Sequence, residues 1–159
     1  VLFSLAGAKK VIIYEPVPEN HKFIRKNVEL NHVNAEIHEA GIGCENATIK
    51  VNPEQADNNF GFSPTNQQYD MKINNISEVI SSSGADVAKI DCEGAEICLK
   101  TVAKEVLEKI PCYIIELHGE EVRNELSMKF LSAGFRITNT KNSSSNLAVI
   151  TFLRLGNKI

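Results

Sequence analysis

The chain has 159 residues, of which 43% are hydrophobic and 23% are charged, and its formal net charge is −3. This length and composition fit one globular domain with a sizeable core, and no apolar run approaches the length of a membrane span. The slight negative charge provides no basic surface, so we expect neither nucleic acid nor a membrane among the partners.

The four cysteines carry no metal-ligand spacing and no CxxC pair. They are Cys44, Cys92, Cys98 and Cys112. Three of them lie in apolar surroundings, which favours reduced, buried thiols rather than a disulfide framework. We therefore expect a cytoplasmic protein.

The first part of the chain predicts a strand followed by a helix. Residues 1–8 have the pattern of the end of a helix, and residues 10–15 form a nearly continuous apolar run. Such a run is typical of a parallel strand that is buried on both faces. Pro16 ends this strand, and Pro18 suits the first turn of a helix.

The middle of the chain predicts short strands and a long loop. The expected strands are 35–40, 48–51 and 71–73, and residues 52–68 are expected to form a surface loop. Asn75 and Glu78 have the capping-box spacing, which predicts the start of a short helix.

The second half alternates strands with helices. We expect strands at 86–91 and 112–118, helices at 94–110 and 120–133, and a closing hairpin of strands 135–138 and 147–153. The hairpin is too tight for a crossover, so its strands are antiparallel. The pattern predicts an α/β fold: a Rossmann-like, doubly wound sheet, mostly parallel with a C-terminal antiparallel hairpin, in a single domain over residues 1–159.

Acidic residues and a histidine lie at the carboxyl ends of the predicted parallel strands. They are Glu15, Asp91, Glu93, Glu116 and His118. Ligands of doubly wound sheets bind at the carboxyl ends of the strands, so we expect the site there. A carboxylate at Glu15 is suited to accept hydrogen bonds from a ribose diol, although a solvated acid at a strand end would look the same.

Lys89 is expected inside the buried strand 86–91. A buried ammonium group is costly unless it is paired, and Glu116 shares the same face on the adjacent strand. We therefore predict a Lys89–Glu116 ion pair, the alternative being that Lys89 extends to the edge of the sheet.

Four sequence blocks together resemble the FkbM-type methyltransferases. They are Tyr14-Glu15-Pro16-Val17-Pro18, then Asn27 with Leu30-Asn31, then Lys89-Ile90-Asp91-Cys92-Glu93-Gly94-Ala95-Glu96, and finally Ile115-Glu116-Leu117-His118. The third block is the most specific one. The resemblance implies a class I fold and a transferase that uses S-adenosylmethionine, with O-methylation of a small molecule or a sugar hydroxyl, so that a small molecule or a glycan is the expected partner.

The resemblance also implies which residues contact the cofactor. These are Glu15, Pro16, Gly41, Ile42 and Asp91. Gly41 and Ile42 would cover the adenine, although a plain turn explains Gly41-Ile42-Gly43 equally well.

Enzymes of this type begin with a strand and a glycine-rich turn that this chain lacks, so we expect the chain to be N-terminally incomplete. Strands 11–15 and 87–91 would then not pair. Another segment would fill the gap, or they would stand about 9–10 Å apart.

Methyl transfer to a hydroxyl requires alignment and benefits from a general base. The candidate catalytic residues are Asp91, Glu93 and His118. The alternative for Asp91 is a structural acid that accepts loop amides, and the alternative for His118 is a hydrogen-bonded loop residue. A metal held by these three side chains is conceivable, but no ligand spacing supports it, so we expect no metal. The alternative functions are a nicotinamide-nucleotide oxidoreductase and a catalytically silent nucleotide-binding domain.

Overall fold

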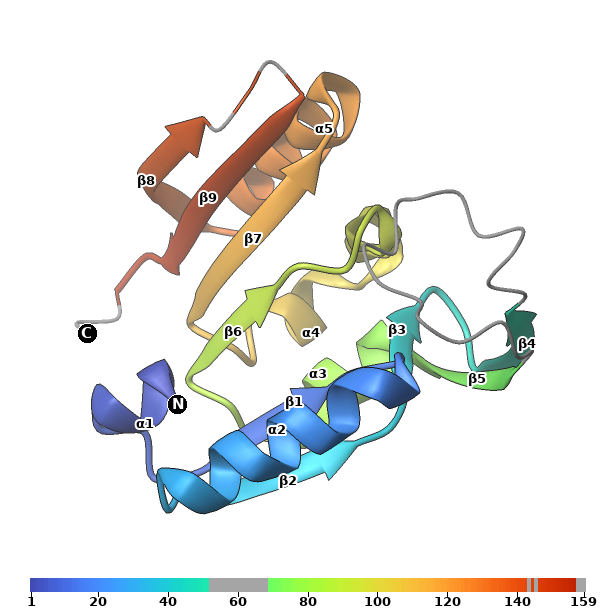
Figure 1. Cartoon of the computed structure of the whole chain (residues 1–159). Helices are drawn as coiled ribbons and strands as arrows, with labels where there is room; N and C mark the ends of the chain where they lie inside the picture. Colours follow the sequence, from blue (N-terminus) through green and yellow to red (C-terminus); the bar gives the residue numbers. More distant parts are fainter. Residues whose placement is uncertain (52–68, 143, 145, 157–159) are drawn as a thin grey trace. The chain divides into compact units, whose positions relative to one another are not determined.

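The computed structural model describes residues 1–51, 69–142, 144 and 146–156 (Figure 1). The described residues form two compact units, the first from the ranges 1–42 and 46–74 and the second from the ranges 43–45 and 75–156. The predicted loop over residues 52–68 lies outside the described residues.

The first unit is built on a strand–helix–strand crossover. Strand β1 (Val11–Tyr14) pairs in parallel with β2 (Ala35–His38), and helix α2 (Pro18–Leu30) connects them. Pro18 occupies the first turn of α2, as predicted, because this position needs no amide donor. The short helix α1 (Leu2–Leu5) precedes β1.

A second small sheet contains β3, β5 and β4. Its strands are β3 (Gly41–Gly43), β4 (Ala47–Val51) and β5 (Tyr69–Asn75), with β5 in the centre and antiparallel to β4. The interpretation of Gly41-Ile42-Gly43 as a turn was therefore wrong. These residues are extended, because they form backbone hydrogen bonds as a strand of this sheet.

The second unit has a four-stranded sheet in the order β6-β7-β9-β8. The strands are β6 (Val87–Ile90), β7 (Cys112–His118), β8 (Phe135–Asn142) and β9 (Leu147–Arg154). β6 and β7 are parallel, whereas β9 is antiparallel to both β7 and β8. The predicted closing hairpin is confirmed.

The core of the second unit is aromatic. Helix α5 (Glu120–Ser132) packs against the sheet and brings Phe130 against Tyr113, Phe135 and Phe152, all with at most 2% exposure. These rings bury a large apolar area, which is the main favourable term in folding. Helix α3 (Ile76–Ser83) begins at Asn75, whose side chain accepts the amides of Ser77 and Glu78, as the sequence predicted.

The fold class is mixed α/β, but a single doubly wound sheet is not observed, because the described strands form three separate sheets. β1 pairs with β2 and β6 with β7, so the described residues contain no pairing between strands 11–15 and 87–91. β1 is only half-buried, since its sheet has two strands and one crossover helix. The prediction that it is buried on both faces was therefore wrong.

The helix predicted over residues 94–110 is broken. A 3-10 helix, η2 (Ala95–Thr101), is followed by extended backbone at Val102 and Ala103 and then by the short helix α4 (Lys104–Leu107). The β-branched pair Thr101-Val102 has low helix propensity, and burial of Val102 favours the extended conformation.

Candidate functional site

Glu96 is the centre of a hydrogen-bonded cluster in the second unit. It has no exposed surface, although it carries a carboxyl group. One oxygen, Oε2, accepts the Gly94 amide at 2.7 Å, and Oε1 accepts the His118 amide at 2.9 Å and contacts His118 Nδ1 at 2.9 Å. A buried carboxylate is costly unless donors surround it, and these three partners provide them.

The turn between β6 and η2 positions the second acid of the cluster. Glu93 and Gly94 both have left-handed backbone conformations, with φ of 49° and 100°. This conformation is strained for glutamate but favourable for glycine, and strained residues cluster at functional sites. The turn directs the Gly94 amide toward Glu96 and leaves the Glu93 side chain near His118.

His118 lies at the end of β7 between two carboxylates. Its Nδ1 faces Glu96, and its Nε2 lies 3.4 Å from Oε2 of Glu93. Partial burial lowers the pKa of His118, but the hydrogen bond to Glu96 and the charges of Glu96, Glu93 and Glu116 outweigh it, so the net pKa is raised above its ordinary value. The imidazolium form is therefore stabilised at this position.

Asp91 lies at the end of β6 and pairs with Lys89 at 2.7 Å. The predicted Lys89–Glu116 pair was wrong, because β6 is an edge strand and the Lys89 side chain is 43% exposed there. Lys89 therefore remains solvated and binds the carboxylate two residues further along the same face.

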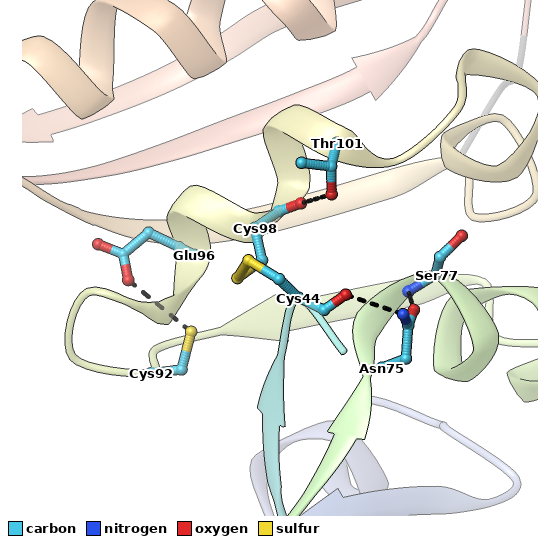
Figure 2. The surroundings of a disulfide bond; sticks show 7 residues. All are labelled: Cys44, Asn75, Ser77, Cys92, Glu96, Cys98 and Thr101. Carbon is cyan, nitrogen blue, oxygen red and sulfur yellow. Dashed lines mark hydrogen bonds between the residues drawn. A yellow bond between two sulfur atoms is a disulfide. The ribbon is translucent and has the colours of Figure 1, made fainter. Parts of the chain in front are cut away.

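Cys92 lies within the same turn but is not a nucleophile. Its thiol contacts Glu96 Oε2 at 3.8 Å (Figure 2). Burial raises the pKa of Cys92 to about 12, with further contributions from the negative charges of Glu96, Asp91 and Glu93. A thiol with such a pKa stays protonated and acts only as a weak donor.

A disulfide joins Cys44 to Cys98 and fixes η2 at a second point (Figure 2). The prediction of four reduced thiols was therefore wrong for this pair, although Cys92 and Cys112 are free. The Cys44 carbonyl also accepts the side-chain amide of Asn75 at 2.8 Å. Sequence spacing offered no signal for the pairing, since the two cysteines are 54 residues apart.

In the first unit, Glu15 follows β1 and is half-buried. Its Oε1 accepts the Val17 amide at 2.8 Å, and its carbonyl contacts His21 Nε2 at 2.8 Å. These contacts fix the carboxylate just before α2, while each of its oxygens retains acceptor capacity. The arrangement fits the predicted role of accepting hydrogen bonds from a diol.

Packing within the first unit accounts for the absence of a side chain at Gly41, without a ligand. A side chain at this position would place its Cβ 2.9 Å from Cδ1 of Ile73 and 3.4 Å from Cβ of Pro16. Gly41, Pro16 and Ile73 are therefore packed together, and Ile42 follows Gly41 within β3. The role of Pro16, Gly41 and Ile42 in cofactor binding stays a prediction.

The structure thus brings together two of the three predicted catalytic residues, Glu93 and His118, and places Asp91 in an ion pair with Lys89. Sequence reasoning missed Glu96 as their organiser. The only available signal was its place in the Asp-x-Glu-Gly-x-Glu block. Within the described ranges, no three His, Cys, Asp or Glu side chains form a group able to hold a metal ion.

Residues 2–153 match the family described as Methyltransferase FkbM domain. Because the match spans nearly the whole chain, the chain belongs to the FkbM methyltransferase family. The resemblance seen in the sequence is confirmed.

A solved structure of a methyltransferase FkbM from Methylobacillus flagellatus KT is similar in fold, with a TM-score of 0.63 and 17% identity. The match covers 91% of this chain and 36% of that chain, so this chain spans about a third of its length. No curated protein matches the chain. Among the residues that the structure describes, no helix has the length and hydrophobicity to span a membrane.

Proposed function

We propose that this domain catalyses methyl transfer from S-adenosylmethionine to a hydroxyl oxygen of a small molecule or a sugar. The observation that carries the proposal is the His118 imidazole between Glu93 and Glu96 in a chain of the FkbM family. At pH values above its pKa, the neutral ring of such a histidine can take the proton of a hydroxyl group, and its raised pKa makes it a stronger base than a free imidazole. When bound, the cofactor supplies an electrophilic methyl group on a cationic sulfur.

The charges of the cluster support a cationic cofactor. The negative charges of Asp91 and Glu93 help to raise the pKa of the Cys92 thiol, and the negative charge of Glu116 helps to raise the pKa of His118. This concentration of carboxylates attracts a sulfonium and disfavours an acceptor that carries its own negative charge. A neutral hydroxyl compound is therefore the proposed acceptor.

The proposed cofactor contacts are those expected from the family resemblance: Glu15, Pro16, Gly41, Ile42 and Asp91. Glu15 supports this set best, because its carboxylate is anchored by the Val17 amide and still has free acceptor positions. Its role is to accept hydrogen bonds from the ribose diol of the cofactor.

Isothermal titration with S-adenosylmethionine and, separately, with NAD tests the proposal. We expect the sulfonium compound to bind, and E15Q to weaken binding about 10- to 100-fold, because a charge-assisted hydrogen bond contributes about 1.5–3 kcal/mol. E36Q removes an exposed carboxylate of β2 and serves as the control. Binding of NAD alone would favour an oxidoreductase, and binding of neither compound would favour a silent domain.

The cytoplasmic location expected from the sequence remains a prediction. The Cys44–Cys98 disulfide weighs against it, because disulfides persist mainly in oxidising compartments. Cell fractionation tests the location, and counting the free thiols of the unreduced protein from the same fraction tests whether the disulfide is present there.

A further inference from the structure

The partners of Glu96 determine which nitrogen of His118 carries the proton. Both carboxylate oxygens already accept backbone amides, Oε2 from Gly94 and Oε1 from His118. An ionised carboxylate has no proton to donate, so the His118 Nδ1 that lies 2.9 Å from Oε1 must be the donor. In the neutral ring, Nε2 is then the nitrogen with the lone pair.

The second nitrogen faces the side of the ring where a proton can arrive. Nε2 lies 3.4 Å from Glu93 Oε2, and the side chains of His118 and Glu93 are 29% and 49% exposed. Glu96, by contrast, is completely buried. The ring is therefore anchored on the buried side through Nδ1 and accessible on the other side through Nε2.

We propose that Glu96 is a positioning residue that holds His118 as the Nδ1–H tautomer, so that Nε2, beside Glu93, is the base for the acceptor hydroxyl. This inference rests on the proposed function and identifies one base among Asp91, Glu93 and His118. The acceptor oxygen bonds to the methyl carbon while the carbon–sulfur bond breaks and leaves its electron pair on sulfur. The hydroxyl proton moves to Nε2. The remaining group is a neutral thioether.

The surrounding charges favour this proton transfer. Glu96 faces the ring from η2, Glu93 from the preceding turn and Glu116 from β7, and all three raise the pKa of His118 against the opposing effect of burial. The Cys92 thiol near Glu96 stays neutral. An imidazolium that forms during transfer is therefore paired on both nitrogens, by Glu96 and by Glu93.

A purely structural role for Glu96, as an anchor between η2 and β7, would use the same amide contacts. The tautomer and the titration of His118 distinguish the two roles, since an anchor that acted only on the backbone would change neither. Long-range ¹H–¹⁵N NMR of the histidine-labelled protein measures both, and the signals lost in H118N assign His118.

In the wild-type protein, we expect the His118 ring to be the Nδ1–H tautomer at pH values above its pKa. We also expect the pKa of His118 to exceed the ordinary value of about 6.5. E96Q should lower the pKa and weaken the tautomer preference, whereas E93Q should lower the pKa and retain the tautomer. A wild-type Nε2–H tautomer, or an unchanged titration in folded E96Q, would overturn the proposal. If E96Q does not fold, the tautomer of His118 in the wild type and in E93Q still tests the proposal.

Steady-state kinetics tests whether His118 is the base. Methyl glycosides serve as probe acceptors, and the release of S-adenosylhomocysteine is measured. H118N retains a side-chain N–H that can donate to Glu96, but it lacks the Nε2 lone pair. Its rate should fall about 10²- to 10⁴-fold and lose the rise with pH, with cofactor affinity unchanged. An unchanged pH profile in H118N would contradict the role of His118.

A wild-type protein that binds the cofactor but methylates no glycoside would contradict the proposed acceptor class. The tautomer measurement would still test the role of Glu96.

Discussion

Loss of the Cys44–Cys98 disulfide should strongly destabilise the second unit. The bond joins the segment after β3 to η2 and closes a loop with a sequence separation of 54. Cys44 is exposed and Cys98 is buried, so a reductant can reach the bond from the side of Cys44. The two perturbations are chemical reduction and the double substitution C44A/C98A.

The magnitude follows from the entropy that the bond removes from the unfolded chain. For a loop of this length, the chain-entropy relation gives about 4 kcal/mol at 25 °C. A change of 1 kcal/mol shifts the melting temperature of a protein of this size by about 2–4 °C, so the expected decrease is about 8–16 °C. The Cys98 side chain adds a small cavity penalty in the double variant.

Urea unfolding followed by far-ultraviolet circular dichroism, with and without reductant, measures this change in the free energy of unfolding. The reductant should destabilise the wild type and leave C44A/C98A unchanged. The control is C112A, which removes a buried free thiol and should retain the full response to the reductant. Four free thiols in the unreduced protein, or a wild-type response below about 1 kcal/mol, would refute the reasoning.

Three further outcomes are expected from the structure. Because the folded pKa of His118 is raised, its contribution to stability is complete below the unfolded value of about 6.5 and is lost as pH rises through the folded pKa. Urea unfolding on both sides of this range should show that loss in the wild type, and a flatter pH dependence in H118N; identical slopes would contradict the pairing. F130A should cost about 3–5 kcal/mol of unfolding free energy because Phe130 is completely buried. M128A on the same helix should cost less than about 0.5 kcal/mol because Met128 is 65% exposed, and equal losses would show that the core is assigned incorrectly. N75A should lower the free energy of unfolding by about 1 kcal/mol or more, because it removes both the helix cap and the side-chain hydrogen bond to the Cys44 carbonyl. N75D keeps the cap acceptor but loses the donor to Cys44, so it should recover only part of the loss.

Local signals predicted most of the secondary structure. Strand β7 was expected over residues 112–118 and occurs there, since a continuous apolar run specifies a buried strand. The Pro18 and Asn75 helix starts were also correct, because capping depends on the residues next to the helix end. The break after η2 was missed, since apolar periodicity alone does not show that Val102 is buried in an extended conformation.

The candidate site was predicted in part. The sequence indicated Glu93 and His118, because both lie at the carboxyl ends of predicted strands and belong to the blocks that resemble the family. It gave the wrong partner for Lys89, since the pairing assumed a buried strand and β6 lies at an edge of its sheet. An edge strand leaves the ammonium group solvated, so no distant carboxylate is required.

The amino-acid sequence by itself determined the family, the order of the strands and helices along the chain, and the block that carries the acids. Only the tertiary structure decided that Glu96 is buried against His118, 22 residues away, and that Cys44 bonds to Cys98. The physical reason is that capping and periodicity act over a few residues, whereas these two pairings exist only after the chain has folded and brought distant residues together.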